Sequence, residues 1–194
     1  MNEINKIYYE ATDWCEELSL TKPRPIVIEA IENRLQVATN KLEIIALKEH
    51  LVRLYQLTQD YPKARSELED IVKFESGSEM AYASLASHYL YFEDDPQSAL
   101  NSIAAAEIAA AASGHFRRHI QAQKARIALA LNDYELFSGA LIEITEISIL
   151  NGQRDVKKER DFFDRADKKK LDPKLVEAFE LYLKSKPDAS ERPA

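Results

Sequence analysis

Residues that form turns are scarce in this chain, and that scarcity restricts its fold more than any other feature. The 194 residues include only four glycines and seven prolines. An all-β chain of this length needs a turn signal roughly every 8–12 residues, whereas a chain of long helices needs far fewer. Alanine, leucine, glutamate and lysine, which favour helices, are abundant, and runs of β-branched residues are few. The sequence therefore predicts an all-α protein.

The few turn signals divide the chain into about ten helices. Apolar residues recur every three or four positions within each segment, which is the period of a helix face. Asn40 and Asp95 are expected N-caps, and Pro96 fits a first helical position because its missing N–H is not needed there. The expected helices span residues 4–18, 25–37, 41–57, 64–74, 79–93, 97–112, 115–131, 134–150 and 172–185, with a charged segment over 154–170. Such short connections force neighbouring helices to pack antiparallel.

An internal repeat indicates stacked pairs of helices. Three positions recur after 34 residues: Leu51 with Leu85, Val52 with Ala86, and Tyr55 with Tyr89. Two more recur after 35 residues: Ala64 with Ala99, and Leu68 with Ile103. A period of 34 residues is that of the tetratricopeptide repeat (TPR), a helix–turn–helix unit. Residues 45–75 and 79–112 resemble two such repeats, and residues 118–149 resemble a less complete third copy.

The resemblance implies an all-α fold of about five antiparallel helix hairpins in a right-handed α-α superhelix, a TPR-like solenoid. Some positions depart from the family pattern. Lys48 stands in place of an aromatic residue, Val52 in place of glycine, Phe137 in place of alanine and Ala128 in place of tyrosine. We expect a single domain over residues 1–186, a C-terminal capping helix at 172–185, and a disordered tail at 187–194 that has nothing to bury.

The overall charge is acidic, with a formal net charge of -7 from 26 basic and 33 acidic side chains. An acidic protein repels nucleic acid and anionic membranes unless its charge is strongly segregated. Segregation occurs over residues 154–170, where eight basic side chains outnumber five acidic ones. This excess is small, so we interpret the segment as a solvated helix with ion pairs such as Asp161–Arg165. Nucleic-acid binding through 154–170 remains an alternative.

The sequence offers no clear catalytic or metal-binding motif. Cys15 is the only cysteine, and beside Trp14 on an apolar face we interpret it as a buried structural thiol. His115 and His119 lie one helical turn apart, but the glutamate and third ligand of a metalloprotease motif are missing. A glycine-rich phosphate loop is also absent from the sequence. We therefore predict that the chain is not an enzyme and has no metal or cofactor.

The N-terminal sequence lacks the apolar core of a signal peptide, and no stretch is apolar enough to span a bilayer. These observations predict a cytoplasmic protein that has no membrane partner.

The TPR resemblance implies a protein–protein interaction scaffold or adaptor. In that family the first helix of each hairpin lines a concave groove, which takes a segment of a partner. Mapped onto this chain, the candidate groove residues are Glu49, His50, Arg53, Gln56, Ser87, Tyr91, His119, Gln123 and Arg126. Arg53, Tyr91 and Arg126 are the candidate anchors, because desolvated Arg and Tyr side chains dominate interface energies.

Two further hypotheses follow from the charge and from the chain ends. A small acidic protein can neutralise a basic toxin or nuclease, as immunity or inhibitor proteins do, with electrostatic steering that speeds capture. The apolar faces at residues 4–18 and 175–182 also leave homo-oligomerisation through the terminal helices open.

Overall fold

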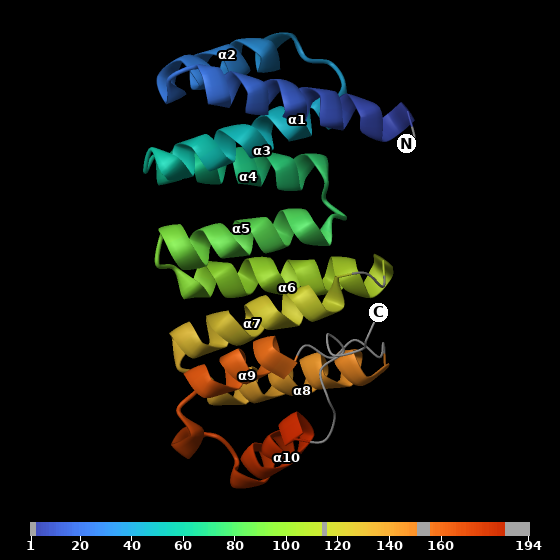
Figure 1. Ribbon diagram of the computed structural model, residues 1–194, viewed down its shortest axis with the longest axis vertical. Helices are drawn as coiled ribbons and strands as arrows, with labels where there is room; N and C mark the ends of the chain where they lie inside the picture. Colours follow the sequence, from blue (N-terminus) through green and yellow to red (C-terminus); the bar gives the residue numbers. More distant parts are fainter. Residues whose placement is uncertain (1–2, 114–115, 151–155, 185–194) are drawn as a thin grey trace. The chain divides into compact units, whose positions relative to one another are not determined.

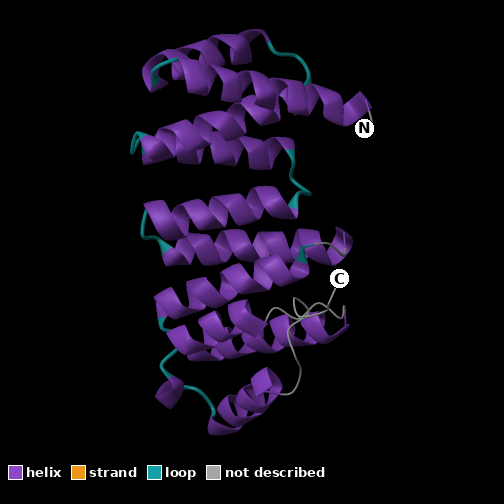
Figure 2. Ribbon diagram, viewed as in Figure 1, coloured by secondary structure: helices purple, strands orange, loops and turns teal. Residues whose placement is uncertain are grey.

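The computed structural model describes residues 3–113, 116–150 and 156–184, which form ten α-helices, one short 3-10 helix and no strand (Figures 1 and 2). The all-α prediction is confirmed. The helices group into two compact units, residues 1–93 and 94–194, and each unit is described by itself.

The first unit contains α1 to α5. Their bounds are α1 Glu3–Thr21, α2 Arg24–Val37, α3 Lys41–Leu57, α4 Tyr61–Phe74 and α5 Glu79–Phe92. Successive helices in this unit are joined by short turns and run antiparallel (Figure 1). The helix α3 is central, because it contacts α1, α2 and α4, and α4 in turn contacts α5.

The second unit contains α6 to α10. Their bounds are α6 Pro96–Ser113, α7 Arg117–Leu131, α8 Tyr134–Leu150, α9 Val156–Arg165, the 3-10 helix η1 Lys168–Lys170, and α10 Pro173–Lys184. The pair α7 and α8 has the most extensive contact, and α6 also lies against α7. Residues 173–184 agree with the predicted C-terminal helix, whereas the tail predicted at 187–194 lies outside the described residues. The predicted single domain and repeat boundaries remain predictions.

Side-chain caps set where several helices begin. The Asn40 carboxamide accepts a hydrogen bond from the amide of Leu42, and the Asp95 carboxylate accepts one from Ser98, as expected for N-caps. The helix expected from residue 64 instead begins at Tyr61. Asp60 caps it by accepting from the amide of Lys63, and a proline in the first turn needs no hydrogen-bond donor there.

The residues that flank α7 at its two ends have a left-handed backbone conformation. Phe116 has φ 55° and Asn132 has φ 56°. Asparagine adopts this conformation more readily than most residues and commonly ends helices. The helix expected from residue 115 therefore begins at Arg117, directly after the left-handed Phe116. Asp133 then caps α8 by accepting a hydrogen bond from the amide of Leu136.

The core of the first unit combines large aliphatic side chains from several helices with small ones. Leu47 and Leu51 of α3 are almost fully buried, as are Ala64 of α4 and Ala86 of α5. The buried Cys15 of α1 belongs to the same core, and burial raises the pKa of its thiol to about 11. The predicted structural thiol is confirmed.

In the core of the second unit, two side chains differ in size from the residues that the TPR pattern has at the predicted equivalent positions. Phe137 of α8 stands in place of the usual alanine, and Ala128 of α7 in place of the usual tyrosine. Both are fully buried in one core, together with Phe163 and Phe179, whose rings lie 4.8 Å apart. Relative to the predicted third repeat, a large and a small residue have exchanged helices, a kind of change that protein cores tolerate when the total volume is kept.

Among the described residues, no helix combines the length and the apolar character that crossing a membrane requires.

Gly139 lies in the interior of α8, and a Cβ atom added there meets nothing within 4 Å. Glycine costs a helix interior roughly 0.5–1 kcal/mol relative to alanine, because it loses more backbone entropy on folding. We expect Gly139→Ala to raise the free energy of unfolding by about that amount, with an unchanged urea m-value. Equilibrium urea denaturation measures both, and a loss of stability would contradict the open environment of Gly139.

Candidate partner-binding surfaces

The candidate residues of the first unit lie on two helices that touch each other. Glu49, Arg53 and Gln56 follow each other at spacings of four and three on α3, and Ser87 and Tyr91 are four apart on α5. The Gln56 Nε2 atom lies 3.1 Å from Nδ1 of His88, which joins α3 to α5. We call the exposed side chains of Arg53, Leu57, Ser84 and Tyr91 the α3–α5 surface.

Arg53 and Tyr91 are the large, unengaged side chains of this surface. Arg53 is exposed, and 57% of Tyr91 is exposed, as is 55% of Leu57. Neither Arg53 nor Tyr91 forms an ion pair, hydrogen bond or ring contact with another described residue. Large exposed side chains without an intramolecular role suit a binding surface, because they lose no internal contact when a partner buries them.

Glu49 is exposed, but its side chain already has a partner within the protein. Its carboxylate accepts a hydrogen bond from the Tyr8 hydroxyl at 2.5 Å, which links α1 to α3. Burial, this hydrogen bond and the carboxylate charge together raise the pKa of Tyr8 to about 12. Glu49 therefore helps hold α1 against α3, and a partner that used it would compete with Tyr8.

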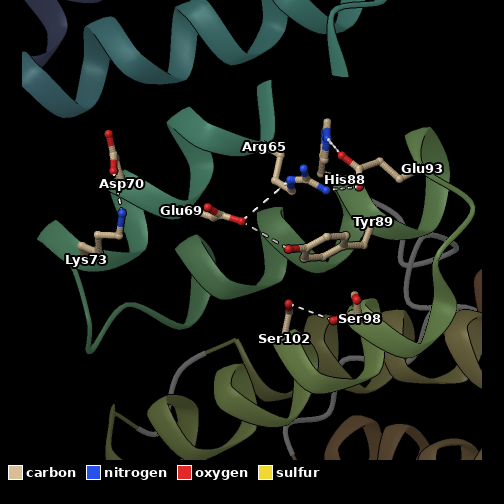
Figure 3. A network of polar contacts seen from close by, with 9 residues as sticks. All are labelled: Arg65, Glu69, Asp70, Lys73, His88, Tyr89, Glu93, Ser98 and Ser102. Carbon is tan, nitrogen blue, oxygen red and sulfur yellow. Dashed lines mark hydrogen bonds and ion pairs between the residues drawn. The ribbon is translucent and has the colours of Figure 1, made fainter. Parts of the chain in front are cut away.

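A polar network centred on the buried His88 joins α4 and α5 (Figure 3), and the contact of His88 with Gln56 extends it to α3. His88 is fully buried, and its Nε2 lies 3.2 Å from the Glu93 carboxylate. A carboxylate only accepts, so Nε2 carries the hydrogen and Nδ1 accepts from Gln56. Arg65 of α4 donates to Glu93 at 2.8 Å.

Aromatic side chains complete the support around the imidazole of His88. Its ring stacks on Phe92 at 5.4 Å and meets Tyr61 edge-on at 6.4 Å. Alongside, the Tyr89 hydroxyl donates to Glu69, which also faces Arg65 (Figure 3). These contacts tie α3, α4 and α5 together.

His50 differs from the prediction that it faces a partner. Only 5% of it is exposed, so its side chain contributes almost nothing to the surface. Its position on α3 one residue after Glu49 turns it toward the interior, where burial lowers its pKa and the nearby Arg53 charge lowers it further.

In the second unit, each candidate residue contacts another described side chain. His119, Gln123 and Arg126 lie at spacings of four and three on α7. The Gln123 Nε2 is 2.9 Å from Nε2 of His119, and only 8% of Gln123 is exposed, so it too adds little surface. The Arg126 guanidinium lies 4.9 Å from the ring centre of Phe162 on α9. Partial burial and the Arg126 charge lower the pKa of His119.

Two buried charged groups were not found by sequence reasoning. Only 7% of Lys48 is exposed, and its ammonium pairs with Glu67 at 2.5 Å and Asp70 at 3.1 Å, both on α4. Burial alone would lower the pKa of Lys48, but the hydrogen bonds and charges of its two partners outweigh burial and raise it. The departure of Lys48 from the aromatic TPR position was visible in the sequence, but its partners were not.

Glu159 is the second such group, and it is fully buried in the second unit. Its carboxylate accepts hydrogen bonds from Ser148 at 2.8 Å, Tyr182 at 3.1 Å and Arg118 at 3.2 Å. These donors come from α8, α10 and α7, so one carboxylate on α9 joins four helices. Donors this distant in sequence leave no local pattern, and no sequence signal identifies the cluster.

The described part of the basic segment at 154–170 contains two ion pairs between residues four apart. Asp161 pairs with Arg165 at 2.7 Å, as predicted, and Asp164 with Lys168 at 3.2 Å. Arg154 and the side chains of Lys157 and Lys158 lie outside the described residues. Among described residues no group of three His, Cys, Asp or Glu side chains is placed to hold a metal ion, and His115 lies outside them.

Comparison with known proteins identifies the fold. No family model matches the sequence, and a search of curated proteins also finds no match. Among solved structures, nearly identical TPR-like repeats of a Podosopora anserina protein assigned as a kinesin light chain superpose with a TM-score of 0.64 at 14% identity. A glutamine-to-methionine variant of those repeats superposes with a TM-score of 0.66 at 13% identity. Each match covers 96% of this chain and 100% of the other.

The fold is a TPR-like helical repeat. The predicted fold class is thereby confirmed, because the helices within each unit pack in adjacent pairs as in the TPR-like structures. Identities of 13% and 14% establish the fold and leave the partner open.

The burial of His50 makes the stability of the folded protein depend on pH. Its pKa is lowered in the folded state, so the unfolded chain binds a proton more readily, and stability falls as the pH drops through the ordinary histidine pKa near 6.5. We expect the unfolding free energy to decrease between pH 7.5 and 5, and to decrease less in His50→Gln. Urea denaturation at several pH values measures the slope, and equal slopes would contradict this effect.

The two arginine anchors should differ in what they contribute to stability. Arg126 packs over Phe162, whereas Arg53 has no described partner. We expect Arg126→Ala to lower the free energy of unfolding by about 0.5–1 kcal/mol, the range of a partly exposed cation–π contact. We expect Arg53→Ala to stay within about 0.5 kcal/mol of wild type, as is usual for surface positions. Thermal and urea denaturation of both variants tests the difference.

Proposed function

We propose that the chain is a protein-binding scaffold that docks a segment of a partner protein on the α3–α5 surface. The observation that carries the proposal is the pair Arg53 and Tyr91, two large exposed side chains with no described internal partner. The TPR-like fold supports a scaffold in general, and the α3–α5 surface supplies a particular place for binding. The function is binding without catalysis.

The chemistry of this surface favours a segment with mixed polar and apolar contacts. The Arg53 guanidinium offers several donors to a carboxylate or carbonyl, and the Tyr91 ring offers apolar area with a polar end. Leu57 and Ser84 add an apolar contact and a small polar group. The His88 network links α3, α4 and α5, and a surface on helices that are already packed together loses little ordering entropy on binding.

The test is affinity capture from the lysate of the source organism, followed by measurement of the dissociation constant for the protein captured. We expect the double variant Arg53→Ala/Tyr91→Ala to bind at least thirty-fold more weakly, since one hot-spot residue contributes about 2 kcal/mol or more. A matched control, Leu20→Ala/Arg24→Ala, removes an exposed Leu and an exposed Arg elsewhere and should bind within two-fold of wild type.

Other results would redirect the assignment. A partner held equally well by wild type and by a folded Arg53→Ala/Tyr91→Ala variant would exclude the α3–α5 surface. Capture of a basic partner with an affinity that falls steeply with salt, regardless of these substitutions, would favour the acidic neutralising protein. Recovery of nucleic acid alone, lost when the basic residues of 154–170 are neutralised, would contradict protein binding.

A further inference from the structure

Helices α6, α7 and α8 of the second unit line two adjoining hollows that are open to solvent. One has a volume of about 190 Å³ and is lined by α6, α7 and α8, including Ala111 and Arg117. The other has a volume of about 460 Å³ and is lined by α7, α8 and Asp133 of the turn between them, including Lys124 and Gly139. Gln121 and Glu143 line both cavities, so the two form one hollow, which we call the α6–α8 groove.

The charge of this groove is acidic. Four carboxylates line it, Glu107, Asp133, Glu135 and Glu143, against two cations, Lys124 and Arg117. Lys124 pairs with Glu107 at 2.8 Å and Arg117 with Glu143 at 3.7 Å. The two carboxylates at the start of α8, Asp133 and Glu135, form no ion pair with a described basic side chain, so carboxylates outnumber cations in the lining.

Gln121, at the junction of the two cavities, has an unsatisfied acceptor. Only 5% of the residue is exposed, and its Nε2 donates to the Glu107 carboxylate at 2.6 Å. Because a carboxylate only accepts, the amide nitrogen must face Glu107, and this fixes the orientation of the carboxamide. The Oε1 atom then has no donor among the described residues, which is costly for a buried polar atom.

Apolar and small residues flank the groove. On α6, 76% of Ile108 is exposed, and Ala111, one turn further on, lines the groove. On α8, 45% of Ile142 is exposed, next to Gly139, whose missing side chain leaves open space. Exposed isoleucines provide anchors for an apolar face, and small residues permit close approach of a helix backbone.

We propose that the α6–α8 groove docks a basic amphipathic helix of a partner protein. The apolar face of that helix covers Ile108 and Ile142. A Lys or Arg side chain from its border enters the groove beside Glu135 and Glu143, against Gln121, which lines both hollows. The acidic lining selects a cationic partner and repels nucleic acid. This surface is separate from the α3–α5 surface and does not depend on it.

A helical peptide library tests the proposal with the 194-residue chain as bait. The library is an 18-residue amphipathic helix with a constant Leu/Ala face and Lys, Glu or Ser at the bordering positions. We expect selected peptides to be rich in Lys, and their acidic counterparts to bind at least ten-fold more weakly. Selection of acidic or uncharged peptides, or no selection at all, would overturn the proposal.

Variants of the groove locate the binding. A Cβ atom added at Gly139 meets nothing within 4 Å, and glutamine is a better helix former than glycine, so we expect Gly139→Gln to stay folded while its side chain occupies the hollow. We expect it, and Ile108→Arg, to weaken binding of a selected peptide at least ten-fold. The control Leu20→Arg adds the same charge at a residue that is 86% exposed in the first unit and should change binding less than two-fold.

Two further measurements separate this surface from the one in the proposed function. Binding should weaken with added salt, and NMR shift changes should concentrate on residues 104–111, 117–124 and 133–146. Arg53→Ala/Tyr91→Ala should bind the peptide as wild type does. If that variant loses the peptide while Gly139→Gln retains it, the α6–α8 groove is not the docking site, whatever happens to the scaffold function.

Discussion

Close packing of antiparallel helices is the constraint on which both units of this protein depend. Helix backbones approach closely only where small residues meet large ones, and Ala64, Ala86, Ala99 and Ala125 are all completely buried. The exchange of Phe137 and Ala128 between α8 and α7 obeys the same rule, because one large and one small residue still share the seam. Replacing any of these alanines by a larger residue would push apart helices that carry the candidate binding residues.

Buried polar clusters add specificity to this packing. Lys48, His88 and Glu159 are each nearly or completely buried, and each has partners on at least one other helix. Burying a charge is costly unless it is paired, and breaking such a pair costs about 3–5 kcal/mol. A helix shifted along its neighbour would leave these groups unpaired, so the clusters favour a single alignment of the helices. The network at His88 also holds α3 and α5 beneath Arg53 and Tyr91.

The two proposed binding surfaces use different features of the TPR-like fold. The α3–α5 surface presents large side chains that project from rigid helices, whereas the α6–α8 groove is a hollow with acidic lining and apolar borders. The first suits a segment that wraps around exposed anchors. The second suits a cationic helix that inserts a side chain. Gln121 and Gly139, which define the second, carry no motif and were not singled out in the sequence.

The sequence by itself determined the all-α class, most helix bounds and the TPR-like repeat, because turn residues, caps and apolar spacing act within a few residues of each other. It also predicted the buried Cys15 and the Asp161–Arg165 pair, which are similarly local. Only the tertiary structure decided which side chains on one helix face are exposed to solvent. His50 and Gln123 have the same spacing signal as Arg53, yet they are buried, because neighbouring helices cover them. Long-range packing, which leaves no periodic pattern in the chain, made that difference.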